Sequence, residues 1–152
     1  MRRLRTLIKI ATVIGPAAVK VLELYGPQIR RLIKENPEFF ETFKQRLRSL
    51  AGAKKDKSGP AGLARRVETL REQTVYLYGT ANNVAAAEQA TKWRTELDQM
   101  EKVLPVVDTM ERRERRAHIR RLESQLDALA AAIVQAVLVD DIEDADIVQD
   151  EE

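Results

Sequence analysis

The chain has 152 residues, with 26 Lys and Arg against 24 Asp and Glu, no cysteine and a single histidine, His118. The absence of cysteine excludes disulfides, thiolate catalysis and cysteine-ligated zinc, and one histidine excludes multi-histidine metal sites. Nineteen alanines, six glycines and an aromatic fraction of only 5% suit long helices better than a β-sandwich.

The net charge of +2 conceals a strong gradient along the chain. Residues 1–58 carry a net charge of +9, residues 59–137 carry +1, and residues 138–152 carry −8. A basic first segment, a balanced middle and an acidic end imply different partners for each part.

Residues 1–50 are predicted to form a basic amphipathic helical arm. The apolar side chains of the arm keep one helical phase and fall on a single face, while basic side chains dominate the opposite side. The predicted apolar face consists of Leu4, Leu7, Ala11, Ile14, Ala18, Leu22, Tyr25, Ile29, Leu32, Phe39, Phe40, Phe43, Leu47 and Leu50.

Three prolines punctuate this arm. Pro16, Pro27 and Pro37 each follow Gly or Asn, which can close one helix, and proline is favoured in the first turn of the next helix. Each junction is therefore predicted to be a break or a kink. Because the prolines recur on the polar side, the arm is expected to bend with its apolar face concave, around a rounded core or along a membrane surface.

A flexible linker is predicted over residues 51–62, where Gly, Pro and Lys concentrate and helical periodicity stops. Residues 63–104 return to helical periodicity, in two apolar stripes that are out of register with each other. The join lies near Gly79, Asn82 and Asn83. Either the helix breaks around residues 79–83, or it continues with a local change of twist. We favour one continuous or slightly kinked helix, because the neighbouring alanines are strong helix formers.

Pro105 is expected to end that helix, and Asp108 is expected to cap the next one, with Glu111 three residues later. A short loop makes the two helices antiparallel neighbours. The second helix has a clean apolar seam at Ile119, Leu122, Leu126, Leu129, Ile133 and Ala136. The predicted fold is therefore all-α: a long, coiled-coil-like antiparallel hairpin over 63–138, with the punctuated helices of the arm completing a three- or four-helix bundle or docking on a membrane.

Residues 139–152 are predicted to form a solvated or partner-dependent acidic tail. Within residues 1–50, the longest stretch without charge, Ile10–Val19, has ten residues. A spanning helix needs roughly 20 apolar residues. The chain is therefore expected to be cytoplasmic, and peripheral at the inner face of the membrane if it reaches a membrane. The Arg and Ala richness is typical of a bacterial source.

The start of the arm has the composition of a helix that lies on an anionic membrane surface. The alternative is that the same apolar face packs on the predicted hairpin as part of a bundle, and the hydrophobic pattern does not separate the two. In the membrane interpretation, headgroup contacts come from Arg2, Arg3, Arg5, Lys9 and Lys20, and apolar insertion comes from Leu7, Ile8, Ile14 and Val21.

A second candidate surface is the arginine run of residues 112–121. Arginine binds phosphates as a bidentate fork, but interleaved Glu111 and Glu114 lower the local potential, and salt bridges from Arg112 and Arg115 to Glu96, Asp98 or Glu101 are the simpler interpretation. The residues expected to bind an anion, if this surface does so, are Arg112, Arg113, Arg116, Arg120 and Arg121. No aromatic side chain interleaves with them to stack on bases.

No phosphate-loop, dinucleotide-binding or nucleophile-elbow motif occurs, and no acid–base pair stands out. We therefore expect no enzymatic activity, no cofactor, no metal and no small-molecule substrate. The leading hypothesis is a scaffold or interaction protein at the membrane surface, whose partner is anionic lipid or a protein. The alternatives are a nucleic-acid or acidic-partner binder, and a coiled-coil homo-oligomer in which the basic arm meets the acidic tail.

Overall fold

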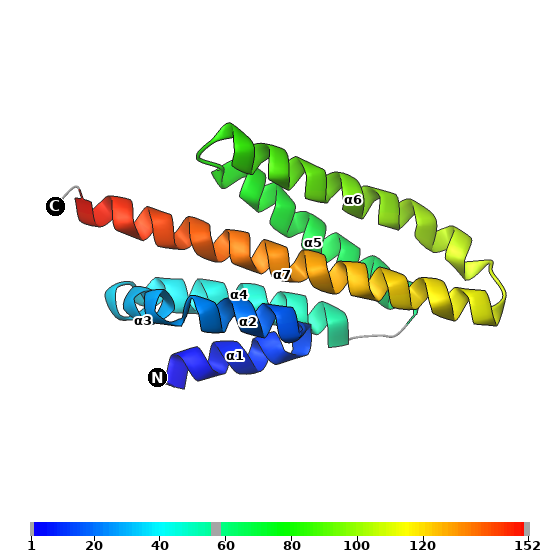
Figure 1. The fold of residues 1–152 in the computed structure, drawn as a ribbon, viewed down its shortest axis with the longest axis horizontal. Helices are drawn as coiled ribbons and strands as arrows, with labels where there is room; N and C mark the ends of the chain where they lie inside the picture. Colours follow the sequence, from blue (N-terminus) through cyan, green and yellow to red (C-terminus); the bar gives the residue numbers. More distant parts are fainter. Residues whose placement is uncertain (1, 56–58, 151–152) are drawn as a thin grey trace.

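The computed structural model describes residues 2–55 and 59–150, and every regular element in those ranges is an α-helix. The prediction of an all-α fold is therefore confirmed. The helices are α1 (Arg2–Ile14), α2 (Pro16–Leu24), α3 (Gly26–Glu35), α4 (Pro37–Lys55), α5 (Pro60–Thr80), α6 (Val84–Asp108) and α7 (Arg112–Asp150). In Figure 1, α7 runs along the molecule between the first four helices on one side and the α5–α6 pair on the other.

The three proline junctions of the arm are breaks rather than kinks. Pro16 and Pro37 each begin a new helix, and Pro27 is the second residue of α3. Proline suits these positions because the first-turn N–H groups of a helix have no intrahelical partner. Gly15, between α1 and α2, has φ of +153°, a backbone conformation that other residues rarely adopt. The exposed prolines let the chain fold back, so that α1 packs on α4 and α2 on α7.

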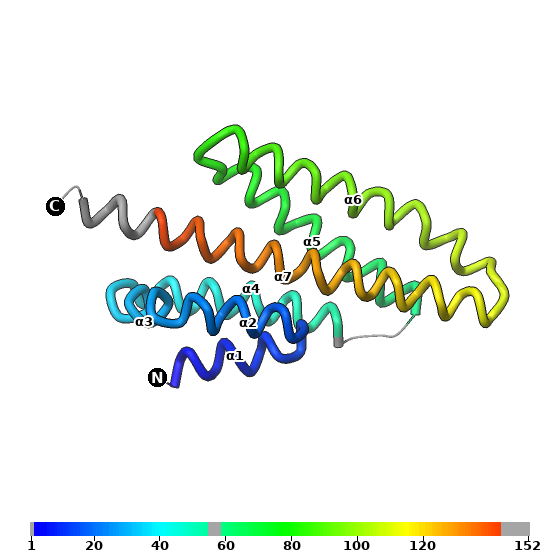
Figure 2. Tube along the Cα trace, viewed as in Figure 1, coloured from blue at the N-terminus to red at the C-terminus, as the bar shows by residue number. Residues whose placement is uncertain are grey.

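The apolar face of the arm is the core of the molecule. All of its predicted members are buried except Tyr25, which is half-buried. Phe43 stacks on Phe39 with 5.4 Å between the ring centroids. In this conformation the arm therefore packs as a bundle, the alternative that hydrophobic periodicity left open. The backbone trace in Figure 2 shows α1 to α4 gathered on one side of α7.

The prediction of one long helix over 63–104 is wrong. The helix ends at Thr80, and a new helix begins at Val84 after three non-helical residues. The Asn83 side chain accepts a hydrogen bond from the Ala86 N–H at 2.8 Å, which caps α6. The chain reverses at this point, and α5 and α6 form the most extensive helix pair in the fold. The predicted hairpin of 63–104 against 108–138 is therefore replaced by a hairpin of α5 against α6.

Two smaller predictions about helix ends are also wrong. Pro105 lies inside α6, which continues to Asp108, and α7 begins at Arg112 rather than near Asp108. Proline is tolerated there because Pro105 is exposed, so the Glu101 carbonyl that lacks a backbone partner is on the solvent side. The predicted linker over 51–62 is shorter than expected, because α4 reaches Lys55 and α5 starts at Pro60.

Helix α7 joins the two halves of the fold. Its predicted seam is buried at Leu122, Leu126, Leu129 and Ile133, and half-buried at Ile119 and Ala136. The seam packs mainly on α2 and α5, with less contact to α6. The helix continues through most of the predicted acidic tail to Asp150.

The stretch Arg112–Glu143 of α7 includes an 18-residue window that is apolar enough to cross a membrane by length and composition. Half of that window is buried inside the molecule, and the core helix of a soluble protein passes the same test. Its apolar character is accounted for by the packing of α7 between the two halves.

Candidate anion-binding surfaces

The first candidate surface is the N-terminal basic face, defined as Arg2, Arg3, Arg5, Lys9 and Lys20. All five side chains are exposed, and α1, which carries four of them, has no acidic residue. The Arg3 guanidinium also lies over the Phe40 ring, 5.3 Å from its centroid. The face is basic because the apolar side of α1 is turned inward against α4.

The apolar residues expected to insert into a membrane have different positions. Leu7 and Ile14 are 0% and 1% exposed, so they are core residues and cannot insert while α1 stays packed. Ile8 and Val21 are half-buried against the same core. The structure therefore separates the predicted membrane residues into an accessible basic set and an enclosed apolar set.

The second candidate surface is a hollow between the N-terminus of α5 and the first turns of α7. We call it the arginine pocket, and it has a volume of about 640 Å³. Four arginines at helical spacing form its α7 wall, and the first residues of α5 form the other side. The pocket is lined by Gly59, Pro60, Asp108, Arg112, Arg115, Arg116, Ile119, Arg120 and Glu123.

The arginine pocket contains part of the predicted anion-binding set. Arg112, Arg116 and Arg120 line it, whereas Arg113 and Arg121 do not. Arg115 lines it as well, although a salt bridge to an acidic residue before Pro105 is the expectation for that side chain. The signal was present in the sequence, because residues 112, 115, 116 and 120 recur at the three- and four-residue spacing of one helix face.

The predicted salt bridges of Arg112 and Arg115 to the acidic residues of α6 are not formed. Arg71 on α5 takes those carboxylates instead, contacting Asp98 at 2.7 Å and also Glu101. The hydrogen bond to Glu101 raises the pKa of Arg71 above its ordinary value, although partial burial acts in the opposite direction. Arg71 pairs with these carboxylates because the break at residues 81–83 brings α5 rather than α7 alongside α6.

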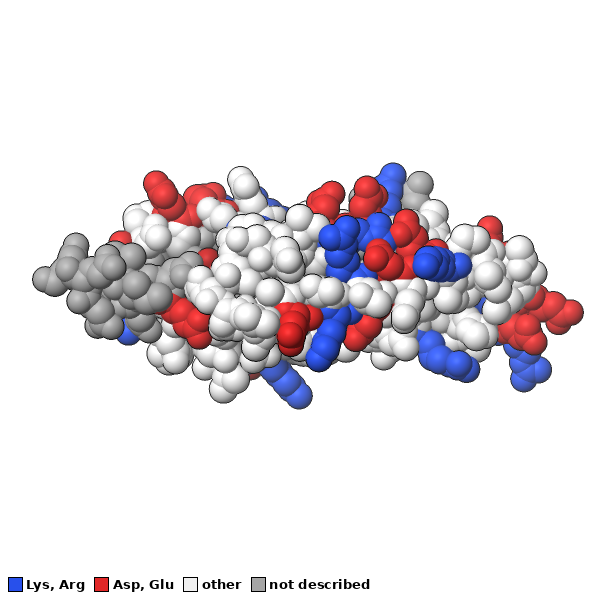
Figure 3. Space-filling view, turned by 90° about the horizontal axis from the view of Figure 1, so that it is seen from above, with Lys and Arg blue, Asp and Glu red and all other residues white. Residues whose placement is uncertain are grey.

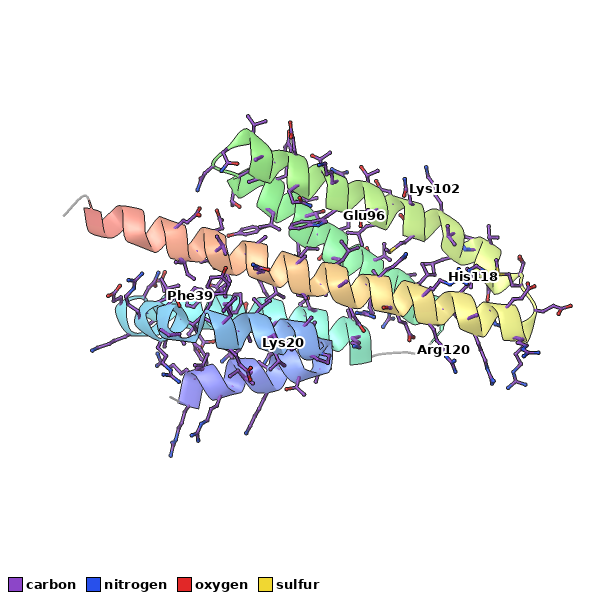
Figure 4. All side chains as sticks on the ribbon, in the orientation of Figure 1. Lys20, Phe39, Glu96, Lys102, His118 and Arg120 are labelled. Atoms are coloured by element: carbon purple, nitrogen blue, oxygen red, sulfur yellow. The ribbon has the colours of Figure 1, made fainter. Side chains whose placement is uncertain are left out.

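Within the part of the chain that the structure describes, no hydrogen bond or ion pair engages the six arginine side chains of residues 112–121. All six are exposed except Arg115, which is half-buried. In Figure 4, Arg120 lies beside α7 near the turn from α6, and Lys20 lies further along the molecule on α2. The two basic surfaces therefore belong to different parts of the fold.

The face seen from above in Figure 3 has a different charge pattern. Near the middle of this face, basic and acidic side chains lie next to each other. Neighbouring charges of opposite sign cancel at a distance, so this face offers little attraction to an anion.

One further charged cluster is structural. The Asp127 carboxylate on α7 accepts contacts from Arg66 of α5 at 2.7 Å and Lys54 of α4 at 3.0 Å. The Lys54 ammonium also donates to the Ile14 carbonyl at the end of α1, at 2.9 Å. The cluster joins four helices, and both cations contact the Oδ1 oxygen of the carboxylate.

The side chains that could serve other chemistry are dispersed. In residues 2–54 and 59–143, no group of three or more His, Asp and Glu side chains is arranged to hold a metal ion. Trp93 packs at the edge of the core, and Tyr78 is exposed while Tyr76 lies under the Arg46 guanidinium. A shallow apolar hollow of about 520 Å³, lined in part by Met100, Val103, Leu122 and Leu129, marks where α6 diverges from α7.

Comparison with known proteins yields no relative: no protein-family model matches the chain, and neither a curated protein nor a solved structure is significantly similar to it.

Proposed function

We propose that this protein is a non-enzymatic interaction protein that attaches to the anionic cytoplasmic surface of a membrane through its N-terminal basic face. The observation that carries the proposal is the composition of α1. Four exposed basic residues and no acidic residue occupy a helix whose apolar side is used by the core. A single-sign surface of this kind attracts anionic headgroups without needing a specific pocket.

The attachment is electrostatic rather than insertive. Each Lys or Arg near an anionic bilayer contributes about 1 kcal/mol, so five residues supply enough for reversible binding. Leu7 and Ile14 remain in the core, and their burial makes insertion costly because α1 would have to leave α4. Binding is therefore expected to weaken strongly as salt screens the charges.

Vesicle co-sedimentation of the full chain tests the proposal. We expect binding to vesicles rich in phosphatidylglycerol, little binding to phosphatidylcholine vesicles, and release at high salt. Replacing Arg2, Arg5 and Lys9 together by Gln should reduce binding at low salt by about a hundredfold, since three contributions of about 1 kcal/mol are removed. The matched control replaces three exposed basic residues of α6, Lys92, Arg94 and Lys102, by Gln and should bind nearly as well as the unmodified chain.

Two results would reject this function. Equal losses in the α1 and α6 variants would mean that only net charge matters. Binding that survives high salt would mean that apolar side chains insert, which requires the arm to leave the core.

The alternative functions have their own outcomes. Binding to DNA or RNA in preference to vesicles would favour the nucleic-acid alternative, and a dimer in light scattering would favour the homo-oligomer.

A further inference from the structure

We propose that the arginine pocket is a second site, independent of the N-terminal basic face, which binds an oligophosphate: a chain of two or more linked phosphate groups on a soluble ligand. The arginine pocket is formed mainly by α5 and α7, whereas the N-terminal basic face is formed by α1 and α2. Neither site depends on the other.

The donors of the pocket are concentrated on one helix face and are unused by the fold. Arg112, Arg115, Arg116 and Arg120 all line the hollow, and none of them is paired with another residue that the structure describes. Each guanidinium presents a planar fork that can donate two parallel hydrogen bonds to the oxygens of a phosphate. The half-buried Arg71 is instead paired, with Asp98 and Glu101.

The charge balance of the pocket favours a multiply charged anion. Four arginines face two carboxylates, Asp108 and Glu123, so the lining has a net positive charge. The start of α5, at Gly59 and Pro60, forms the other side of the pocket, and the positive end of the α5 dipole acts in the same direction as the arginines.

The size and lining of the pocket indicate a phosphate chain rather than a single phosphate or a base. A volume of about 640 Å³ exceeds what one phosphate fills, and four separated forks can engage several phosphates at once. No aromatic side chain lines the hollow, so nothing there would stack on a base. The ligand should be recognised by its linked phosphates, whatever group carries them.

Isothermal titration calorimetry of the full chain with inorganic tripolyphosphate, orthophosphate and adenosine triphosphate tests the proposal. Tripolyphosphate should bind at least about tenfold more tightly than orthophosphate, because it reaches more than one fork. Adenosine triphosphate should bind about as tightly as tripolyphosphate, since the base has no stacking partner. An adenosine triphosphate that bound tenfold more tightly would overturn recognition through phosphates alone.

Matched double variants separate the pocket from general charge. Arg112→Gln with Arg116→Gln removes two lining residues, and Arg113→Gln with Arg121→Gln removes the same charge from the same helix outside the pocket. The first pair should weaken tripolyphosphate binding by about a hundredfold and the second by no more than about threefold. Asp108→Asn removes a lining carboxylate and should strengthen binding severalfold.

Three outcomes would overturn the assignment. They are equal losses in the two double variants, equal affinity for tripolyphosphate and orthophosphate, and no gain from Asp108→Asn. Circular dichroism of each variant checks that the helices persist, and the single variants Arg112→Gln and Arg120→Gln replace a double variant that loses helix. Vesicle binding by Arg112→Gln with Arg116→Gln should be nearly unchanged, so failure of this site is distinguishable from failure of membrane attachment.

Discussion

Asp127 shows how one side chain can join distant segments of this molecule. Its carboxylate contacts Arg66 and Lys54, which come from two other helices, and Lys54 also satisfies the last carbonyl of α1. Arg66 is only 6% exposed, so it cannot turn to water if its partner is lost. A buried cation without a partner is strongly destabilising, because its desolvation is no longer offset.

The substitution Asp127→Asn should therefore lower the free energy of unfolding by about 2 kcal/mol. The value is moderate because the Asp127 side chain is 37% exposed and water can partly replace it. Urea denaturation followed by circular dichroism measures the change. The control is Asp108→Asn, the same chemical change at an exposed residue without a partner among the described residues, and it should shift stability by less than about 0.5 kcal/mol. Equal effects of the two substitutions would contradict the role of the cluster.

At the scale of elements, the fold is decided by where helices stop. Prolines lie in the first two residues of α2, α3 and α4, and Asn83 caps α6, so the chain turns at several closely spaced points. The two out-of-register stripes of residues 63–104 belong to two helices that face each other, which is why they could not share one seam. The arm likewise packs as separate short helices around α4 and α7.

Packing of the arm can be tested with two leucines of α2. Leu22 is 0% exposed and Leu24 is 71% exposed, and both lie in the same nine-residue helix. Leu22→Ala should cost about 2–5 kcal/mol of stability because it leaves a cavity, whereas Leu24→Ala should change stability by less than about 0.5 kcal/mol. Thermal and urea unfolding of both variants provide the comparison. Similar small effects would mean that α2 does not pack on α7 in solution.

At the scale of the whole molecule, the two oppositely charged ends of the chain are brought together. In Figure 1 the start of α1 and the end of α7 lie at the same end of the molecule, and α7 packs on α2 and α3. Residues 1–58 carry a net charge of +9 and residues 138–152 carry −8. The hypothesis that follows is that the acidic end of the chain lowers the potential that an approaching anionic surface meets.

Deleting residues 144–152 removes five acidic and no basic residues, which raises the net charge from +2 to +7. The truncated chain should bind anionic vesicles severalfold more tightly at low salt, and the difference should shrink as salt is added. Co-sedimentation over a salt series measures it.

The control for this deletion raises the net charge equally at a distance from the acidic end. It replaces five exposed glutamates by Gln: Glu68, Glu72, Glu88, Glu96 and Glu114. If the control strengthens binding as much as the deletion does, the position of the acidic end is irrelevant and the masking hypothesis is wrong.

The sequence predicted the helical class, the buried face of residues 2–50 and the apolar seam of α7, because helical periodicity is a local property. It also predicted an arginine-rich surface, but not which arginines share a pocket. A hairpin of residues 63–104 against 108–138 would place Arg115 beside the acidic residues of α6, whereas α5 takes that place in the structure. The sequence allows a break near Asn83, but the helical propensity of the neighbouring alanines favours a continuous helix over a break at a single capping residue.

By itself, the sequence determined that the chain is helical, which residues of the arm and of α7 form an apolar face, and how charge is distributed along the chain. Only the tertiary structure decided which helices are neighbours, because an amphipathic helix can bury its apolar face against any complementary partner. That choice placed Leu7 and Ile14 in the core, paired Arg71 rather than Arg112 with the acids of α6, and brought the start of α5 opposite the arginines of α7. The apolar pattern specifies burial, but the partner that provides it depends on the whole fold.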